Sequence, residues 1–232
     1  WECAAILKHR GSRPFPWLGV AASVGIVWAF ALQPPLVVAF GVLTAAALLA
    51  PTLAMWRRAT AEAMLDATTT TFFPVLFVGL PFAYVVGLRA IPGENGPDLL
   101  LLAMMCVTLS DTGAFYVGSL IGSRPMAPLI SPKKTWEGAL GGVLGSIAGA
   151  LVAHYWFFQR LPLAHALVLG VLLCCAGIVG DLAESALKRS AGVKDSSALL
   201  PGHGGVLDRV DSLLVAAPVL YYYWMVLLAG TC

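Results

Sequence analysis

Apolar stretches of membrane-spanning length occupy most of this chain and limit what it can fold into. A spanning helix needs about 20 mostly apolar residues. Hydrophobic residues make up 59% of the chain and charged residues only 11%, far from the balance of a soluble domain. We therefore predict an all-α, polytopic integral membrane protein with about seven transmembrane helices in 232 residues. The stretches that meet or approach the required length are Trp17–Leu32, Pro35–Met55, Phe72–Leu88, Leu99–Gly122, Gly138–Phe158, Leu163–Gly180 and Ser212–Gly230.

The first residues, WECAAIL, form a short apolar stretch that has no initiator methionine and ends before Lys8. We interpret it as the end of a spanning helix whose beginning precedes this sequence; the family resemblance described below implies one or two further N-terminal helices. Along the chain we distinguish residues 1–98, a set of N-terminal transmembrane helices, from residues 99–232, a C-terminal transmembrane region that carries the candidate active site. The five cysteines show no metal-ligand spacing and are predicted to be free thiols.

The distribution of Lys and Arg predicts the orientation in the membrane. If the seven stretches all span, 12 of the 14 Lys and Arg residues fall in loops on one side, and only Arg89 and Arg160 fall on the other. The side rich in positive charge is expected to face the cytosol. The polar motifs described below all fall on that side. The net charge of +2 is too small to indicate a nucleic-acid partner.

Small residues recur through GALGGVLGSIAG, which begins at Gly138. Such a face suits close approach of two helices in lipid. We expect these glycines to serve helix packing rather than phosphate binding.

Polar residues concentrate between Ser185 and Asp211, where 27 residues contain four basic and three acidic side chains. Polar chemistry beside membrane-length apolar runs is costly to keep and is usually functional. The segment therefore predicts an active site at the membrane face.

Carboxylates flank this segment at helical spacing. Asp181, Glu184, Ser185 and Lys188 follow at i, i+3, i+4 and i+7, and Asp208, Asp211 and Ser212 repeat the first three positions. Two helices that present carboxylates at one membrane face can hold a hard cation through oxygen ligands. The alternative is a structural salt-bridge cluster formed with Lys188, Arg189 and Arg209.

The turn Pro201–Gly205 lies between the two groups of carboxylates. Its glycines allow backbone N–H groups to approach an anion closely. The alternative is a tight loop without a ligand, and His203 fits either a hydrogen-bonding loop residue or a substrate ligand.

Two more groups of polar residues lie near apolar stretches: one just before Gly138–Phe158 and one within Leu99–Gly122. Lys133 and Lys134, followed by Thr135 near a helix start, favour phosphate binding, although juxtamembrane lysines often only set topology. Asp111 is a carboxylate at membrane depth, which is a functional-site hypothesis by default; its alternative is a hydrogen-bonded packing residue.

These motifs resemble the phosphatidate cytidylyltransferase (CDP-diacylglycerol synthase) family. The run SALKRSAGVKDSSALLPGHGGVLDRVD follows that family's signature along its length, and SDTGAFYVG, SPKKTWEG and Gly180-Asp181 resemble its other motifs in the same order. The specific part covers about residues 110–212. The resemblance implies transfer of a cytidylyl group from CTP to phosphatidic acid, which gives CDP-diacylglycerol and pyrophosphate.

The resemblance also implies the site residues, the cofactor and the partners. Mg²⁺ is expected, with K⁺ considered as a second ion, and the protein is expected to be a homodimer in the bacterial inner membrane with its site facing the cytosol. Asp181, Asp208 and Asp211 are predicted metal ligands and, with Lys188 and Arg189, catalytic residues. The predicted substrate-binding residues are Asp111, Ser131, Lys133, Lys134, Thr135, Ser185, Lys194, Asp195, His203, Gly204, Gly205 and Arg209.

Two other functions share part of this pattern. A CTP-dependent polyprenol or phytol kinase would also combine a nucleotide site with an apolar acceptor, but the complete match over Ser185–Asp211 argues against it. An ion-coupled transporter would use Asp111 and Asp181 as coupling carboxylates. The chain lacks the paired halves typical of transporters, and its charges cluster at one face.

Overall fold

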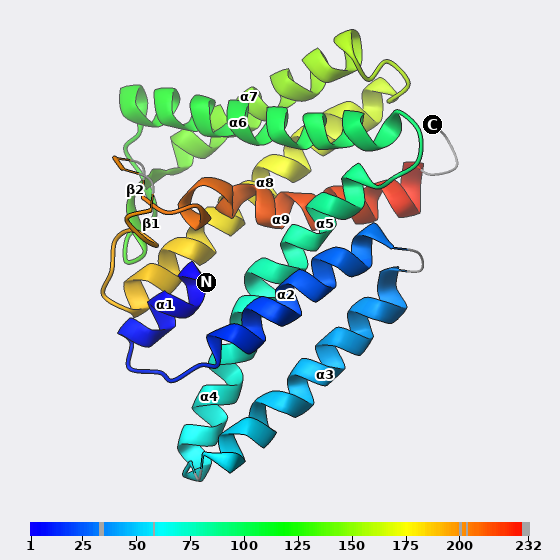
Figure 1. The fold of residues 1–232 in the computed structure, drawn as a ribbon. Coiled ribbons are helices and arrows are strands. Elements are labelled where there is room, and N and C mark those ends of the chain that lie inside the picture. Colours follow the sequence, from blue (N-terminus) through cyan, green and yellow to red (C-terminus); the bar gives the residue numbers. More distant parts are fainter. Residues whose placement is uncertain (33–34, 58, 200, 203, 229–232) are drawn as a thin grey trace. The chain divides into compact units, whose positions relative to one another are not determined.

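The computed structural model describes residues 1–32, 35–57, 59–199, 201–202 and 204–228, without the side chains of residues 35 and 36. Over these residues the regular secondary structure is helical apart from one short hairpin, and loops connect the elements (Figure 1). The elements in chain order are α1 Glu2–His9, α2 Pro16–Ala31, α3 Pro35–Trp56, α4 Ala61–Pro74, the π-helix η1 Val75–Gly79, α5 Leu80–Arg89, α6 Asn95–Ile121, β1 Pro125–Ala127, β2 Ser131–Thr135, α7 Trp136–Trp156, α8 Leu163–Ser190, α9 Leu207–Tyr223 and the π-helix η2 Trp224–Leu228.

The chain forms two compact units. Unit 1 combines Trp1–Gly87 with Leu187–Arg209, and unit 2 combines Leu88–Ala186 with the chain from Val210 onward. The segment Leu187–Arg209 thus interrupts unit 2 in sequence. It begins inside α8 and ends inside α9. The division between residues 98 and 99 that the sequence suggested stays a prediction; by compactness, Leu187–Arg209 groups with Trp1–Gly87.

The predicted membrane class is confirmed: this is a multi-pass, all-α membrane protein. Six helical spans in the described part of the chain are long and apolar enough to cross a bilayer, namely Val37–Trp56, Ala61–Arg89, Asn95–Ile121, Trp136–Trp156, Leu163–Ser190 and Leu207–Leu228. The first predicted stretch corresponds to α2, which is apolar but has only 16 residues. The predicted end at Gly230 lies outside the described residues.

Unit 1 contains a long span that changes its hydrogen-bonding pattern midway. Thr60 caps α4 by accepting a hydrogen bond from the Ala63 amide, so the helix begins well before the apolar stretch that predicted it. Proline lacks the backbone N–H that an α-helix needs, and the π turn η1 lies between Pro74 and Pro81. At its end Gly79 lies against Ser23 of α2, where a Cβ atom would collide with the serine side chain.

Unit 2 is built around the close packing of α6 on α7 (Figure 1). A Cβ atom placed on Gly141, Gly145 or Gly149 of α7 would meet backbone carbonyl oxygens of α6. Without side chains at these positions, the two backbones approach directly. The small-residue face beginning at Gly138 therefore packs within the chain, as the sequence predicted for a helix contact.

Glycines also bring α8 close to α9 within unit 2. A Cβ atom at Gly180 would collide with the carbonyl group of Asp211, and one at Gly177 would lie 3.5 Å from the Ser212 Cβ atom. Gly180 directly precedes Asp181 in α8. The close contact at Gly180 therefore also determines where along α9 the Asp181 side chain is placed.

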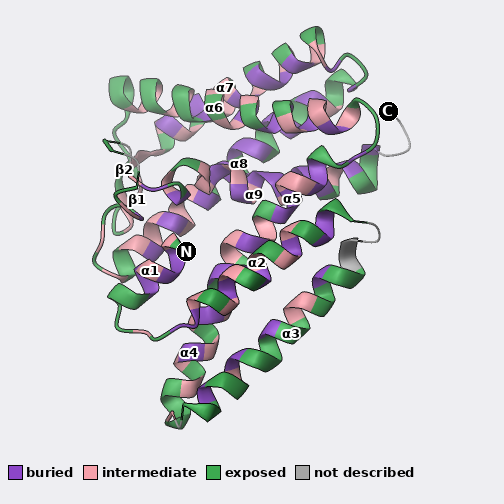
Figure 2. Ribbon diagram, in the orientation of Figure 1, coloured by how far each residue is buried: buried purple, intermediate pink, exposed green. Residues whose placement is uncertain are grey.

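Large apolar side chains remain exposed along the spans, as expected for surfaces in contact with lipid (Figure 2). Within an apolar 18-residue window of each span, between 22% and 44% of the residues are buried. In α3, Val37 and Phe40 are exposed, whereas Ala50 and Ala54 are buried. The buried positions are thus the small residues, and the bulky ones point outward.

We predict that Gly145→Ala will destabilise the protein because the new Cβ atom would collide with the Leu109 carbonyl. Overpacking of this kind costs about 1–3 kcal/mol. Gly41→Ala is the matched control, since a Cβ atom at that helical glycine meets nothing within 4 Å. Thermal unfolding in detergent should show a lower midpoint for Gly145→Ala and an unchanged or slightly higher midpoint for Gly41→Ala. Equal midpoints would contradict the packing described here.

Candidate active site

A pocket in unit 2 brings together three of the polar motifs. Its volume is about 470 Å³. Asp111 enters it from α6, Lys133 and Lys134 from β2, and Asp181 from α8. Its other walls are apolar or small. The full lining is Ser110, Asp111, Ala114, Phe115, Gly118, Ser119, Met126, Lys133, Lys134, Thr135, Gly138, Ala139, Gly177, Ile178 and Asp181.

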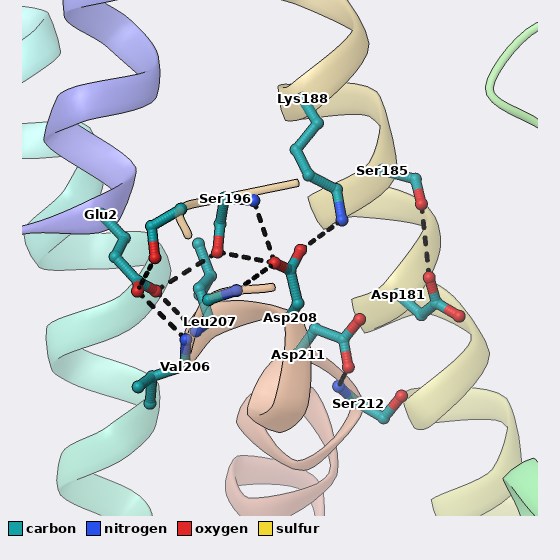
Figure 3. A network of polar contacts seen from close by, with 12 residues as sticks. Glu2, Asp181, Ser185, Lys188, Ser196, Val206, Leu207, Asp208, Asp211 and Ser212 are labelled. Carbon is teal, nitrogen blue, oxygen red and sulfur yellow. Dashed lines mark hydrogen bonds and ion pairs between the residues drawn. The ribbon is translucent and has the colours of Figure 1, made fainter. Parts of the chain in front are cut away.

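Lys134 and Asp181 form an ion pair in this pocket. The Lys134 Nζ atom lies 2.5 Å from Asp181 Oδ2, and the side chains are 24% and 35% exposed. Asp181 Oδ1 accepts a hydrogen bond of 3.3 Å from the Ser185 hydroxyl, one helical turn further along α8 (Figure 3). Three residues predicted from separate motifs therefore meet around one carboxylate.

The hairpin that carries the two lysines is tied to the start of α7. Thr135 caps α7 by accepting a hydrogen bond of 3.1 Å from the Gly138 amide. Glu137 accepts hydrogen bonds from the amide and hydroxyl of Ser123, at 3.1 and 2.8 Å, and from the Arg124 amide at 3.2 Å. These contacts hold the C-terminal end of β2, where Lys134 and Thr135 lie. Ser131, at the opposite end of β2, is half-buried and pairs with Ala127 in the hairpin.

Two further carboxylates of unit 2 lie within electrostatic range of Asp181. They belong to Asp111, which lines the pocket, and Asp211, whose Oδ1 atom accepts a hydrogen bond of 2.6 Å from the Ser212 amide. Carboxylate oxygens are the ligands that a hard cation prefers. In the described part of the chain, however, no three Asp, Glu, His or Cys side chains are grouped closely enough to hold a metal ion. The donors suit Mg²⁺ chemically, but they are not preassembled around an ion position.

Asp208 organises a second polar network, in unit 1 (Figure 3). Its Oδ1 atom lies 2.5 Å from Lys188 Nζ. Its Oδ2 atom accepts hydrogen bonds from the amide and hydroxyl of Ser196, both at 2.9 Å, and from the Gly205 amide at 2.8 Å. The carboxylate is only 8% exposed. A buried charge needs this number of partners, because an unpaired one is costly.

The glycine pair beside Asp208 lies against carboxylates of the protein itself. Gly204 has a φ of +78°, a conformation that favours glycine, and a Cβ atom there would lie 2.8 Å from Asp208 Oδ2. A Cβ atom on Gly205 would collide with the Ser196 hydroxyl. In this structure the Gly205 amide donates to Asp208, and the predicted contact of the turn with a substrate anion stays a prediction. His203 lies outside the described residues, so its predicted role stays a prediction.

The remaining predicted residues of this segment lie at its surface. Arg189, Lys194, Asp195 and Arg209 are exposed. Both ion pairs of the salt-bridge alternative's kind are present, one in each unit. In unit 2 the pair is Lys134 with Asp181, and in unit 1 it is Lys188 with Asp208. The predicted metal ligation remains a prediction.

Sequence reasoning missed three residues that hold these sites in place. They are Glu137, which fixes the hairpin, Ser196, which binds Asp208, and Glu2, which accepts hydrogen bonds from the same loop as Ser196. An acidic residue two positions after Thr135 is a recognisable helix-start signal for Glu137. No local signal connects Glu2 to residues about 200 positions later.

We predict that Glu137→Ala will loosen the hairpin that carries Lys133 and Lys134. The variant removes all acceptors for the Ser123 and Arg124 amides, whereas Glu137→Gln keeps one oxygen that can serve both. Hydrogen–deuterium exchange should become several-fold faster at residues 123–135 in the alanine variant and change little in the glutamine variant. Glu94→Ala, which removes an exposed partner of Arg160 in the same unit, is the control and should leave the hairpin unaffected. Unaltered exchange in Glu137→Ala would show that other contacts hold the hairpin.

Comparison with known proteins gives a family for this arrangement. A sequence model of the Cytidylyltransferase family matches residues 1–227. The chain is similar to proteins named phosphatidate cytidylyltransferase: 40% identical to that of Mycobacterium tuberculosis over 162 residues, which cover 70% of this chain and 47% of the relative. The protein of Staphylococcus saprophyticus is 40% identical over 146 residues, 63% of this chain and 55% of the relative. That of Haemophilus influenzae is 41% identical over 138 residues, 57% of this chain and 48% of the relative.

The chain spans about half the length of the curated relatives it matches. The family match covers nearly all of the described residues, including the pocket of unit 2 and the Asp208 network of unit 1. The resemblance inferred from the polar motifs is thereby confirmed, and the chain belongs to the cytidylyltransferase family.

Proposed function

We propose that this protein transfers a cytidylyl group from CTP to phosphatidic acid, giving CDP-diacylglycerol and pyrophosphate. Membership in the cytidylyltransferase family and similarity to proteins named phosphatidate cytidylyltransferase support the reaction class. The observation that carries the proposal is the unit 2 pocket, where lysines and carboxylates meet an apolar wall in a membrane protein.

The proposed reaction needs positioning and charge neutralisation more than a strong base. A phosphate monoester has a second pKa near 6, so at neutral pH the phosphate of phosphatidic acid is mostly the dianion. One of its oxygens attacks the α-phosphorus of CTP, and the bond from that phosphorus to the bridging oxygen breaks. Pyrophosphate leaves with the electron pair. Because no proton has to be removed from the attacking oxygen, a Ser/His/Asp arrangement is unnecessary.

The lysines of the pocket suit the anionic parts of both substrates. Lys133 and Lys134 line it together with Thr135, and Phe115, Met126 and Ile178 supply apolar surface. A phosphate held by the lysines would leave a lipid chain beside the apolar residues. In unit 1, Lys188 is the corresponding cation: it binds Asp208, which also accepts a hydrogen bond from Gly205 of the predicted anion-binding turn.

Two lysines of the predicted site are bound to carboxylates in the structure, Lys134 to Asp181 and Lys188 to Asp208. A ligand that carries only negative charge could bind a lysine only by displacing its carboxylate partner. That carboxylate would then have no cation beside it. A metal–nucleotide complex brings a partner for both. Asp181, Asp208 and Asp211 would hold Mg²⁺, which when bound neutralises charge on the phosphates. A role for K⁺ at the same site is part of this proposal.

The test is an assay with the purified full-length protein, labelled CTP, phosphatidic acid and Mg²⁺. We expect label from the cytidine to appear in the lipid phase, and none when a long-chain alcohol replaces phosphatidic acid. Asp181→Asn keeps the size of the side chain but removes the charge that binds Lys134. A lost charge-assisted contact corresponds to a fall of roughly 10- to 150-fold in kcat/KM.

Asp98→Asn is the matched control for this variant. Asp98 also pairs with a cation in unit 2, Arg160 at 3.0 Å, and is 14% exposed. It lies 13 residues before Asp111 in α6, or about 20 Å along the helix axis. We expect near wild-type turnover for Asp98→Asn. Failure of the wild type to label lipid would refute the proposed function, and wild-type rates in Asp181→Asn would remove Asp181 from the site.

We further propose that the polar loops face the cytosol across the bacterial inner membrane. The asymmetry of Lys and Arg between alternate loops supports this orientation. In a background without native cysteines, an impermeant thiol reagent applied outside sealed cells should label Ala90→Cys but not Leu199→Cys. Both positions are exposed in the structure. Labelling of Leu199→Cys from outside would reverse the orientation.

The predicted homodimer remains a proposal from the family resemblance. The glycine face of α7 cannot form its interface without unpacking α6, because α6 already covers that face. A dimer contact is therefore expected on one of the exposed apolar faces.

A further inference from the structure

Glu2, the first residue of α1, accepts hydrogen bonds from the far end of the sequence (Figure 3). Its Oε1 atom accepts from the Ser197 hydroxyl at 2.6 Å and the Val206 amide at 3.1 Å. Its Oε2 atom accepts from the Leu207 amide at 2.7 Å and lies 3.3 Å from the Ser196 hydroxyl, whose single proton has its shorter contact, 2.9 Å, with Asp208. All of these residues belong to unit 1.

Two of these donors are backbone amides at the beginning of α9, Val206 just before the helix and Leu207 at its first position. Leu207 is the first residue of α9, and the first amides of an α-helix have no partner within the helix. A carboxylate at this end is also favoured by the helix dipole. Glu2 thus caps α9 from a different element, and Ser196 and Ser197 bring the preceding loop to the same carboxylate.

The position of Glu2 is held by the packing of α1. Cys3, Ile6 and Leu7 are at most 5% exposed, and α1 packs against α4. Burial alone would raise the pKa of Glu2, but the hydrogen bonds from Ser197, Leu207, Val206 and Ser196 outweigh it and leave the pKa below its ordinary value. The side chain is therefore a carboxylate at neutral pH, with four donors arranged around it.

Ser196 connects this carboxylate to the Asp208 network. The Ser196 hydroxyl lies 3.3 Å from Glu2 and 2.9 Å from Asp208, and the Ser196 amide also donates to Asp208. Asp208 in turn binds Lys188. A single loop residue, buried at 6% exposure, is thus held between two carboxylates.

We propose that Glu2 is a positioning residue for the candidate active site: it holds Ser196 and Ser197 beside the start of α9 and thereby sets the orientation of Asp208 and Lys188. The inference rests on the proposed function for its catalytic consequence, while the structural part stands on the hydrogen bonds alone. Glu2 itself is not expected to touch either substrate.

Two substitutions separate the shape of this side chain from its acceptor oxygens. Glu2→Gln keeps the size of the side chain but replaces one acceptor oxygen with an NH₂ group, which is a donor. That group would face the N–H or O–H groups that donate to the carboxylate in the wild type. The serine hydroxyls can rotate to accept, whereas the Val206 and Leu207 amides cannot. Glu2→Asp keeps two acceptor oxygens on a shorter stem. We therefore expect partial rescue by aspartate and the larger loss with glutamine.

The first measurement is hydrogen–deuterium exchange of the full-length protein at residues 193–207. Loss of a helix cap and its loop contacts should make exchange there roughly 5- to 30-fold faster in Glu2→Gln, and less so in Glu2→Asp. Glu62→Gln is the control, since it removes an exposed carboxylate from the first turn of α4 in the same unit. It should leave this segment unchanged.

The second measurement is kinetic, with CTP and phosphatidic acid varied separately. We expect kcat/KM for CTP to fall about tenfold in Glu2→Gln, to recover in part in Glu2→Asp, and to stay at the wild-type value in Glu62→Gln. The KM for phosphatidic acid should not change, because the lysine pocket of unit 2 does not include these residues.

The two measurements distinguish failure of the Glu2 inference from failure of the proposed function. If exchange at residues 193–207 is the same in Glu2→Gln as in the wild type, Glu2 does not position the loop and the inference is wrong. Faster exchange with unaltered kcat/KM for CTP would also overturn it, because the loop position would then not matter for the reaction. If the wild type transfers no cytidylyl group, the proposed function fails, and the exchange experiment alone decides the structural role of Glu2.

Discussion

Ionised carboxylates beside apolar helices need partners, and the polar parts of this protein are organised by how those partners are supplied. Asp208 collects a lysine, two amides and a hydroxyl, and Glu2 collects two amides and two hydroxyls. Asp181 binds Lys134 and Ser185. Since an unpaired buried charge costs several kcal/mol, each carboxylate gathers donors from segments that local structure alone would not bring together.

The same requirement explains the ion pair in each unit. A lysine and a carboxylate neutralise each other at 2.5 Å, Lys134 with Asp181 in unit 2 and Lys188 with Asp208 in unit 1. Each of these charges thus has a partner of opposite sign within its own unit.

Glycine has two distinct uses in this structure, and both concern what lies next to the backbone. Gly141, Gly145 and Gly149 let α7 approach the carbonyl oxygens of α6, which holds the walls of the unit 2 pocket together. Gly204 and Gly205 instead make room for carboxylates in the loop of unit 1. A methyl group would disturb a helix contact in the first case and an anion contact in the second.

The sequence by itself determined the membrane class, the approximate spans and the residues that carry charge, because hydropathy and length are local properties of the chain. The helical spacing of Asp181, Glu184, Ser185 and Lys188 also indicated that this helix continues beyond its apolar stretch, and α8 does extend to Ser190. The sequence could not predict what the loop glycines bind or which helix covers α7. Tertiary structure alone decided that Glu2 caps α9, because that contact joins residues about 200 positions apart and depends on the packing of α1.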